Sequence, residues 1–157
     1  VTEAPEVTPE TPEYIVEGNV LYYVYNNVAT TVYSDPIISG KVTIPETIQG
    51  IKITEIAYGT FENRDQITEV ELPDTLMVIG ENAFRNCTGL NSIIIPVTLQ
   101  TVGANAFEGC NGITSIELPN SLEEIKDYSF AENNLASIVI PQNVHDEKSL
   151  GAKKYFL

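Results

Sequence analysis

The sequence predicts a repeat solenoid in which short parallel β-strands and short helical turns stack rung upon rung, beneath an N-terminal β-meander cap. Two observations support this fold class. Phenylalanine recurs every 23 residues, at Phe61, Phe84, Phe107 and Phe130. The stretches ENAFRNCTGLNSIIIP and ANAFEGCNGITSIELP repeat almost the same residues at that period. Repetition at a fixed period is typical of folds in which each unit stacks on the next.

The first element is a tail, residues 1–13, rich in Thr, Pro and Glu. Three threonines, three prolines and four glutamates in thirteen residues are typical of a disordered spacer. The chain does not begin with Met, and we interpret the tail as the remnant of a removed signal or lipoprotein leader. The alternative is that it marks the boundary of a piece of a longer chain.

A β-rich cap is predicted over residues 14–40. Turn signals at EGN and NN separate three β-rich runs, which predicts a meander of antiparallel strands covering the first rung of the solenoid. The cap contains five of the eight tyrosines, which we interpret mainly as half-buried strand residues. An aromatic platform for sugar rings is the alternative. The five are Tyr14, Tyr22, Tyr23, Tyr25 and Tyr33.

The repeats span residues 41–141. In ITEVELP the inward Val70 and Leu72 alternate with polar Glu69 and Glu71, which predicts a short strand with one wet face. Proline cannot donate to a strand pair, so Pro73 ends this strand. The pattern predicts strands near 41–45, 68–72, 92–95, 115–118 and 137–140. Their side chains are expected to stack in columns and bury a continuous core.

A short helical turn is predicted around each phenylalanine, where sequences such as ENAF follow a glycine. The first repeat opens with KVTIP and carries a five-residue insertion around QGIKI. Residues 142–157 remain as a C-terminal cap or tail.

The string LPxxLxxIGxNAFxxCxxLxSIxLP resembles the leucine-rich repeats of BspA-like bacterial surface antigens, over roughly residues 41 to 141. The resemblance implies a parallel-strand solenoid. It also implies a secreted or surface-displayed protein, because relatives are associated with adhesion to host matrix proteins, host cells or other bacteria. Arg64 and Asn133 stand where the middle repeats have Cys87 and Cys110, which suggests that the end repeats act partly as caps.

The two cysteines occupy equivalent positions in adjacent repeats, so their Cα atoms are expected about 5 Å apart, a distance that a disulfide can span. Both side chains point the same way into the core of a parallel stack, however. Free, buried thiols are therefore favoured. A metal site is not expected from two sulfurs without a neighbouring histidine.

Composition limits the partners and the compartment. The 157 residues fit one domain, and 43% hydrophobic content predicts a globular state. The net charge of −14 argues against nucleic acid and against anionic membrane surfaces. No stretch approaches 18 apolar residues, so we expect no membrane insertion of this chain. With the resemblance, these points favour an extracellular or cell-surface anchored protein.

Catalytic chemistry has little support. His145 is the only histidine, and the adjacent Asp146 points away from it, which argues against a Ser-His-Asp arrangement. The pair Glu123 and Glu124 is predicted to lie on a solvent-exposed edge, without the shielded pocket that a catalytic acid and base require. No glycine-rich phosphate loop is present. We therefore expect neither enzymatic activity nor a cofactor.

A binding face is predicted where the outward residues of successive strands form two columns on a regular backbone. Single exposed apolar residues are common, and ordinary surface is the competing interpretation. Two functions stay open: a module that binds an extracellular protein or glycan through this face, or a structural spacer or accessory domain of a larger surface protein. The candidate residues are Glu69, Glu71, Ser92, Ile94, Ser115, Glu117, Ser137 and Val139.

Overall fold

The structure of the chain is a computed structural model, and it describes residues 11–144. This part of the chain contains eleven strands and no helix. The strands are β1 Glu13–Glu17, β2 Val20–Tyr25, β3 Val28–Ser34, β4 Gly40–Thr43, β5 Thr47–Ile48, β6 Ile51–Ile56, β7 Ile67–Glu71, β8 Val78–Ile79, β9 Ser92–Ile94, β10 Thr101–Val102 and β11 Glu124–Ile125. The predicted disordered tail, apart from residues 11–13, and residues 145–157 lie outside the described residues.

The N-terminal meander is confirmed. β1 pairs with β2 and β2 with β3, both antiparallel. The β2–β3 turn is made by Asn26 and Asn27 at φ 49° and 60°, the left-handed values that a tight hairpin requires. β3 then pairs in parallel with β6, which joins the meander to the solenoid.

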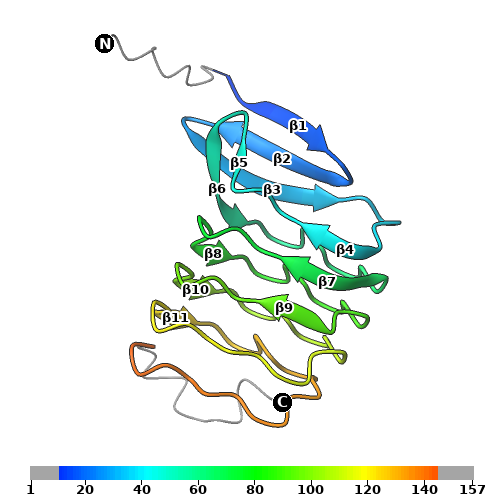
Figure 1. Cartoon of the computed structure of the whole chain (residues 1–157), viewed down its shortest axis with the longest axis vertical. Coiled ribbons are helices and arrows are strands. Elements are labelled where there is room, and N and C mark those ends of the chain that lie inside the picture. The colour runs from blue at the N-terminus through cyan, green and yellow to red at the C-terminus, as the bar shows by residue number, and fades with distance from the viewer. Residues whose placement is uncertain (1–10, 145–157) are drawn as a thin grey trace.

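Two sheets form two walls of the solenoid (Figure 1). The first, sheet A, runs from the meander through every rung to the fourth, in the order β1-β2-β3-β6-β8-β10-β11. The second, sheet B, consists of the parallel strands β4, β7 and β9. The strands β8, β10 and β11 of sheet A were not predicted, because segments of two residues carry no alternating pattern.

The insertion in the first repeat is a hairpin. β5 pairs with β6 in an antiparallel manner, across a turn in which Gln49 and Gly50 have φ 51° and 79°. β6 still pairs in register with β8, with Ile56 beside Ile79, so the extra residues do not disturb the stack. β4 and β7 remain paired despite the insertion between them, with Lys41 beside Glu69.

The third wall consists of turns, and it carries the phenylalanines inward. Phe61, Phe84, Phe107 and Phe130 are buried, as predicted. Consecutive rings stack nearly parallel, with centroids 5.2, 5.3 and 5.4 Å apart and interplanar angles of 6°. The 23-residue period is thus the period of a continuous aromatic stack.

The prediction of helical turns on this wall was wrong. The amides of Phe84 and Phe107 donate to the carbonyls of Ala106 and Ser129 in the next rung, at 2.8 Å in both cases. The intervening amides donate three residues back, as that of Arg85 does to Asn82. In a helix, amides beyond the first turn bond four residues back within the same segment. The wall is therefore a stack of turns bonded from rung to rung.

Asparagine makes these turns possible. Asn82 and Asn105 adopt φ 57° and 53° at equivalent positions, and Asn86 adopts 57° one turn further on. Asparagine enters this left-handed region more readily than other non-glycine residues. A left-handed residue interrupts a right-handed helix, so the ENAF pattern folds into a turn.

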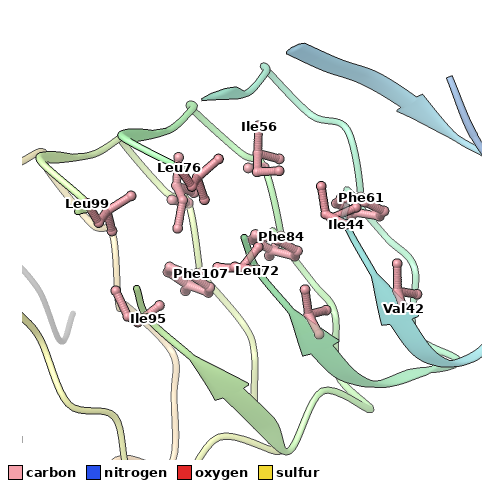
Figure 2. Close-up of a cluster of buried hydrophobic side chains, with 14 of the residues drawn as sticks. Val42, Ile44, Ile56, Phe61, Leu72, Leu76, Phe84, Ile95, Leu99 and Phe107 are labelled. Atoms are coloured by element: carbon pink, nitrogen blue, oxygen red, sulfur yellow. The ribbon is translucent and has the colours of Figure 1, made fainter. Parts of the chain in front are cut away.

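The core lies between the three walls. Figure 2 shows Phe61, Phe84 and Phe107 in a row, between residues such as Ile56 from sheet A and Leu72 at the end of a sheet B strand. The columns at the 23-residue period are buried, as predicted. They include Ile56, Ile79, Val102 and Ile125, and Ile67, Leu90 and Ile113.

Rungs approach closely where glycine occurs. A Cβ on Gly103 would lie 2.5 Å from the carbonyl carbon of Gly80 in the preceding rung, closer than side-chain atoms come to backbone. Gly80 and Gly103 are therefore required for rung spacing rather than for an unusual φ angle.

Three of the five predicted strands are confirmed, and two are not. Residues 115–118 and 137–140 belong to no strand or sheet, although their sequences alternate as β7 does. Ile116 is buried beneath the first segment, whereas Leu118, Leu135 and Ile138 are only partly buried. Rungs near an end have fewer neighbours to pack against, so the alternating pattern alone does not fix a strand there.

Candidate functional site

The first candidate residues occupy the outward face of sheet B in the predicted order. Lys41 pairs with Glu69 and Glu69 with Ser92 in one column, and Glu71 pairs with Ile94 in the next. The inward neighbours in these strands, such as Val70, are buried. The register therefore brings the first four candidates together on one hydrogen-bonded surface.

The N-terminal part of this face is an ion cluster. Lys41 Nζ lies 3.1 Å from Glu69 Oε1 and 3.3 Å from Glu71 Oε2. Thr43 Oγ1 donates to Glu71 Oε2 at 3.1 Å. Hydrogen bonds to Glu69 and then to Glu71 raise the pKa of Lys41, while the Thr43 hydroxyl and then Lys41 lower the pKa of Glu71. Both carboxylates already have internal partners, which leaves them less available to a ligand.

The middle of the face is apolar and hollow. Ile94 is 80% exposed and borders a depression of about 290 Å³ between the third and fourth rungs of the face. Residues 93–95 line one side, and Ser115, Ile116 and Glu117 line the other. Ile93, Ile95 and Ile116 form the apolar floor of the depression, and the exposed side chain of Ile94 forms its apolar edge. Ser115 and Glu117 form the polar rim.

The remaining candidates, Ser137 and Val139, are exposed, Val139 to 80%. They lie in residues 137–140, which, like residues 115–118, form no strand, and they do not line the depression. The structure thus assembles six of the eight candidates around the ion cluster and the depression. It leaves the last two as separate exposed positions.

Sequence reasoning missed the depression. Its lining includes Ile93 and Ile95, which the alternating pattern assigns to the core together with Ile116. The opening arises because β9 is the last strand of sheet B and residues 115–118 are not paired to it. No pattern in the sequence distinguishes this rung from the one before, so no local signal was available.

Both cysteines are free and buried. Cys87 Sγ donates to the Phe61 carbonyl and Cys110 Sγ to the Phe84 carbonyl, each at 3.0 Å. Burial raises the pKa of the Cys87 thiol to about 12, and burial raises that of Cys110 as well. These cysteines therefore serve as structural hydrogen-bond donors in the core.

The replacement of cysteine in the end repeats keeps the same type of bond. Asn133 Nδ2 donates to the Phe107 carbonyl at 2.9 Å, the equivalent of the two thiol bonds. Arg64 instead reaches into the cap, where Nη2 donates to the Ser34 carbonyl at 2.7 Å. The column of side-chain hydrogen-bond donors formed by the two cysteines thus continues into both ends of the stack, where the longer side chains of Arg64 and Asn133 act as the donors.

The described residues show no other chemistry-bearing cluster. Residues 11–144 contain no group of three or more His, Cys, Asp or Glu that could hold a metal ion. Glu123 and Glu124 are exposed, as predicted, and Glu124 Oε2 lies 4.0 Å from Lys126 Nζ. His145 and Asp146 lie outside the described residues. Across that same part of the chain, no helix is long and apolar enough to cross a membrane.

Solved structures show the same fold. The leucine-rich repeat protein of T. pallidum is 25% identical and superposes with a TM-score of 0.73, covering 92% of this chain and 63% of its own. That of Bacteroides ovatus is 28% identical, with a TM-score of 0.72 and coverage of 83% and 36%. That of Bacteroides capillosus is 25% identical, with a TM-score of 0.72 and coverage of 80% and 96%. This chain therefore spans less than two thirds of the first two proteins.

No curated protein matches the sequence. A family model described as "BspA type Leucine rich repeat region (6 copies)" matches residues 54–150. The match covers more than half of the chain and includes the turn wall, sheet B from β7 onward and the depression. The chain belongs to the BspA-type leucine-rich repeat family.

Proposed function

We propose that this chain is a non-enzymatic module that binds a protein partner through the outward face of sheet B, centred on the depression beside Ile94. The observation that supports the proposal is an apolar hollow with a polar rim on a rigid, hydrogen-bonded scaffold. Interfaces commonly combine an apolar centre with a polar edge. The repeat fold itself, being of a bacterial surface type, supports a protein-interaction module in general.

A protein partner fits the depression better than a glycan does. The lining is aliphatic, with Ile93, Ile94, Ile95 and Ile116 and no aromatic ring. Aliphatic hollows accept apolar side chains through the hydrophobic effect. The polar rim of Ser115 and Glu117 can then hydrogen-bond to the backbone of the inserted segment.

We further propose that the module works outside the cell or anchored to its surface, in adhesion to host matrix, host cells or other bacteria. Family membership supports this location and role. The strongly acidic composition agrees, since a net charge of −14 disfavours nucleic-acid and anionic-membrane partners.

Extracellular-matrix protein and glycan arrays with the purified chain test the proposal. We expect a protein ligand whose binding is lost in Ile94→Arg and weakened in Glu117→Arg. Tyr58→Arg is the control for Ile94→Arg, because Tyr58 is also an exposed apolar side chain but lies on the turn wall. Glu123→Arg makes the same charge change as Glu117→Arg at an exposed site in sheet A's wall.

Two results would overturn the proposal. Binding that is equally weak in the face and control variants would place the ligand elsewhere. A chain that binds no component of either array would instead support the spacer or accessory-domain alternative.

A further inference from the structure

The outward face of the cap carries a second surface, on the wall of sheet A, whereas the depression lies on the wall of sheet B. Strand pairing places outward residues side by side in one row: Tyr14 beside Tyr23, Tyr23 beside Thr30, and Thr30 beside Glu55. Neighbouring strands lie about 4.8 Å apart, so the row from Tyr14 to Glu55 is roughly 14 Å long. We call these four residues, with Tyr25, the tyrosine row.

The rings of the tyrosine row are in contact, and those of Tyr14 and Tyr25 are exposed while that of Tyr23 is half-buried. Tyr14 and Tyr23 have centroids 5.3 Å apart, and Tyr23 and Tyr25 6.5 Å apart. Tyr14 is 67% exposed, and Val16 and Val28 on the same strands are exposed as well. The core contacts of β2 come from its other face, through Val20, Tyr22 and Val24. The tyrosine row is therefore not needed to fill the core, and exposed apolar faces of this kind commonly mark interaction sites.

The tyrosine row contains one acidic side chain, Glu55. Glu13 and Glu17 pair with Val24 and Val20, the core-facing residues of β2, and so lie on the other face of β1. Glu55 ends the row, half-buried and with no ion pair among residues 11–144. Burial raises the pKa of this carboxyl group, as expected of an acid without a compensating cation.

The protein itself shows how a cation binds at this edge. The Arg64 guanidinium lies over the ring of Tyr33, 5.5 Å from its centroid, next to the outward face of β3. A guanidinium over a tyrosine ring is attracted by the ring's negative face. The rings of the tyrosine row offer the same contact, and no cation of residues 11–144 lies over them.

We propose that the tyrosine row binds an arginine-rich, extended peptide segment of a partner protein, with guanidinium groups over the rings and one paired with Glu55. Ring tilt favours this partner over a glycan. The rings are inclined by 55° and 45° to one another, so they do not form the single flat platform on which sugar rings stack. The carboxyl group of Glu55, which has no ion pair among residues 11–144, favours a cationic segment.

The test uses the full chain and a fluorescent octapeptide of alternating arginine and valine, measured by anisotropy at about 0.15 M salt. We expect saturable binding. Tyr23→Ser, Tyr14→Ser and Glu55→Gln should each raise the Kd by at least about threefold, the effect of losing one cation contact. Tyr14 is included because its exposure makes a folding defect in that variant improbable.

Two matched controls separate a site from general attraction to an acidic protein. Glu124→Gln removes the same charge from the same sheet, and Tyr58→Ser removes an exposed tyrosine from the turn wall. Both should leave the Kd unchanged. Equal losses in Glu55→Gln and Glu124→Gln, or equal binding of a peptide with citrulline in place of arginine, would overturn the proposal.

Two further outcomes would assign the surface to another occupant and so contradict the proposal. One is glycan-array binding that Tyr23→Ser abolishes. The other is a concentration-dependent dimer, detected by analytical ultracentrifugation, that Tyr14→Ser dissociates. An octapeptide that fails to bind at all would contradict it directly.

Discussion

The turn wall and the outward face of sheet B belong to the same rungs but are held very differently. On the turn wall, each rung is bonded to the next through backbone amides, as from Phe84 to Ala106, and through thiol or amide donors. The four phenylalanine rings stack without interruption. Sheet B, by contrast, ends at β9, and its outward side chains are exposed.

This difference separates stability from recognition. Because the turn wall holds the rungs together, residues on the outward face can vary without loss of the fold. Ile94 and Glu117 are therefore free to serve a ligand. The predictions below test that division by perturbing first the turn wall and then the face.

The largest effect is expected from the phenylalanine stack. Phe107→Ala should lower the free energy of unfolding by about 3–5 kcal/mol, because it opens a cavity with a ring on either side. Phe61→Ala and Phe130→Ala should cost less, since each ring stacks on one neighbour only. Urea denaturation monitored by circular dichroism measures the difference. Equal losses at all three positions would contradict the stacked-rung description.

The buried thiols should make the protein sensitive to alkali. Unfolded thiols ionise near pH 9, whereas the folded-state pKa of Cys87 is about 12 and that of Cys110 is also raised. Between pH 9 and the folded-state pKa values, the unfolded state binds fewer protons than the folded state does. The contribution of the buried thiols to stability is therefore complete below pH 9 and is lost as the pH rises. Each thiol should contribute a loss of about 1.4 kcal/mol per pH unit.

A double variant isolates the thiol contribution. In Cys87→Ala/Cys110→Ala the slope of unfolding free energy against pH should become shallower, and the remainder should include Tyr22, whose pKa burial raises to about 12. Neither thiol of the unaltered protein should react with a thiol reagent until the protein unfolds. Rapid reaction under native conditions, or an unchanged slope in the double variant, would show that the thiols are accessible.

Sequence periodicity was sufficient for the parts of the fold in which one residue type recurs. The phenylalanine column and the Ile56 column were placed correctly, because burial imposes the same side chain on every rung. The turn wall was misread as helical because its sequence favours a helix locally. The segment forms turns instead of a helix because its amides bond to the next rung and because Asn82 and Asn105 adopt left-handed φ angles. Both features depend on the neighbouring rungs.

A smaller effect is expected on the solvent side of the turn wall. Arg85 lies between two acids, with Nη1 3.5 Å from Glu62 Oε1 and Nε 2.8 Å from Glu108 Oε2. Arg85→Gln should cost less than about 1 kcal/mol, and the loss should shrink in high salt because these groups are partly exposed. Thermal melts at two salt concentrations measure it. A loss that does not depend on salt would point to packing instead.

The smallest effect on stability is expected on the binding face. Ile94→Arg should change the free energy of unfolding by no more than about 0.5 kcal/mol, because the side chain is 80% exposed. Denaturation of this variant beside Phe107→Ala gives the comparison within one assay. A loss approaching that of Phe107→Ala would mean that the face also holds the fold.

The candidate site was predictable only in part. The alternation of apolar and polar residues in ITEVELP placed Glu69 and Glu71 on the outward face, and the 23-residue period extended this prediction to Ser92 and Ile94. The ion cluster with Lys41 depends on side-chain conformations, and the depression depends on a strand that does not form. Tyr23 and Tyr25 are two residues apart, so the sequence alone places these members of the tyrosine row on the same face of a strand. Its link to Glu55 required the β3–β6 pairing.

Native-state amide hydrogen exchange tests the division between the walls most directly. The amides of Phe84 and Phe107 donate to the next rung, whereas Ser115 and Glu117 follow the last strand of sheet B. We predict that the phenylalanine amides exchange only through global unfolding, at least about a thousandfold more slowly than those of Ser115 and Glu117. Equal protection of all four amides would show that sheet B continues past β9, and it would contradict both the open face and the depression on which the proposed binding site depends.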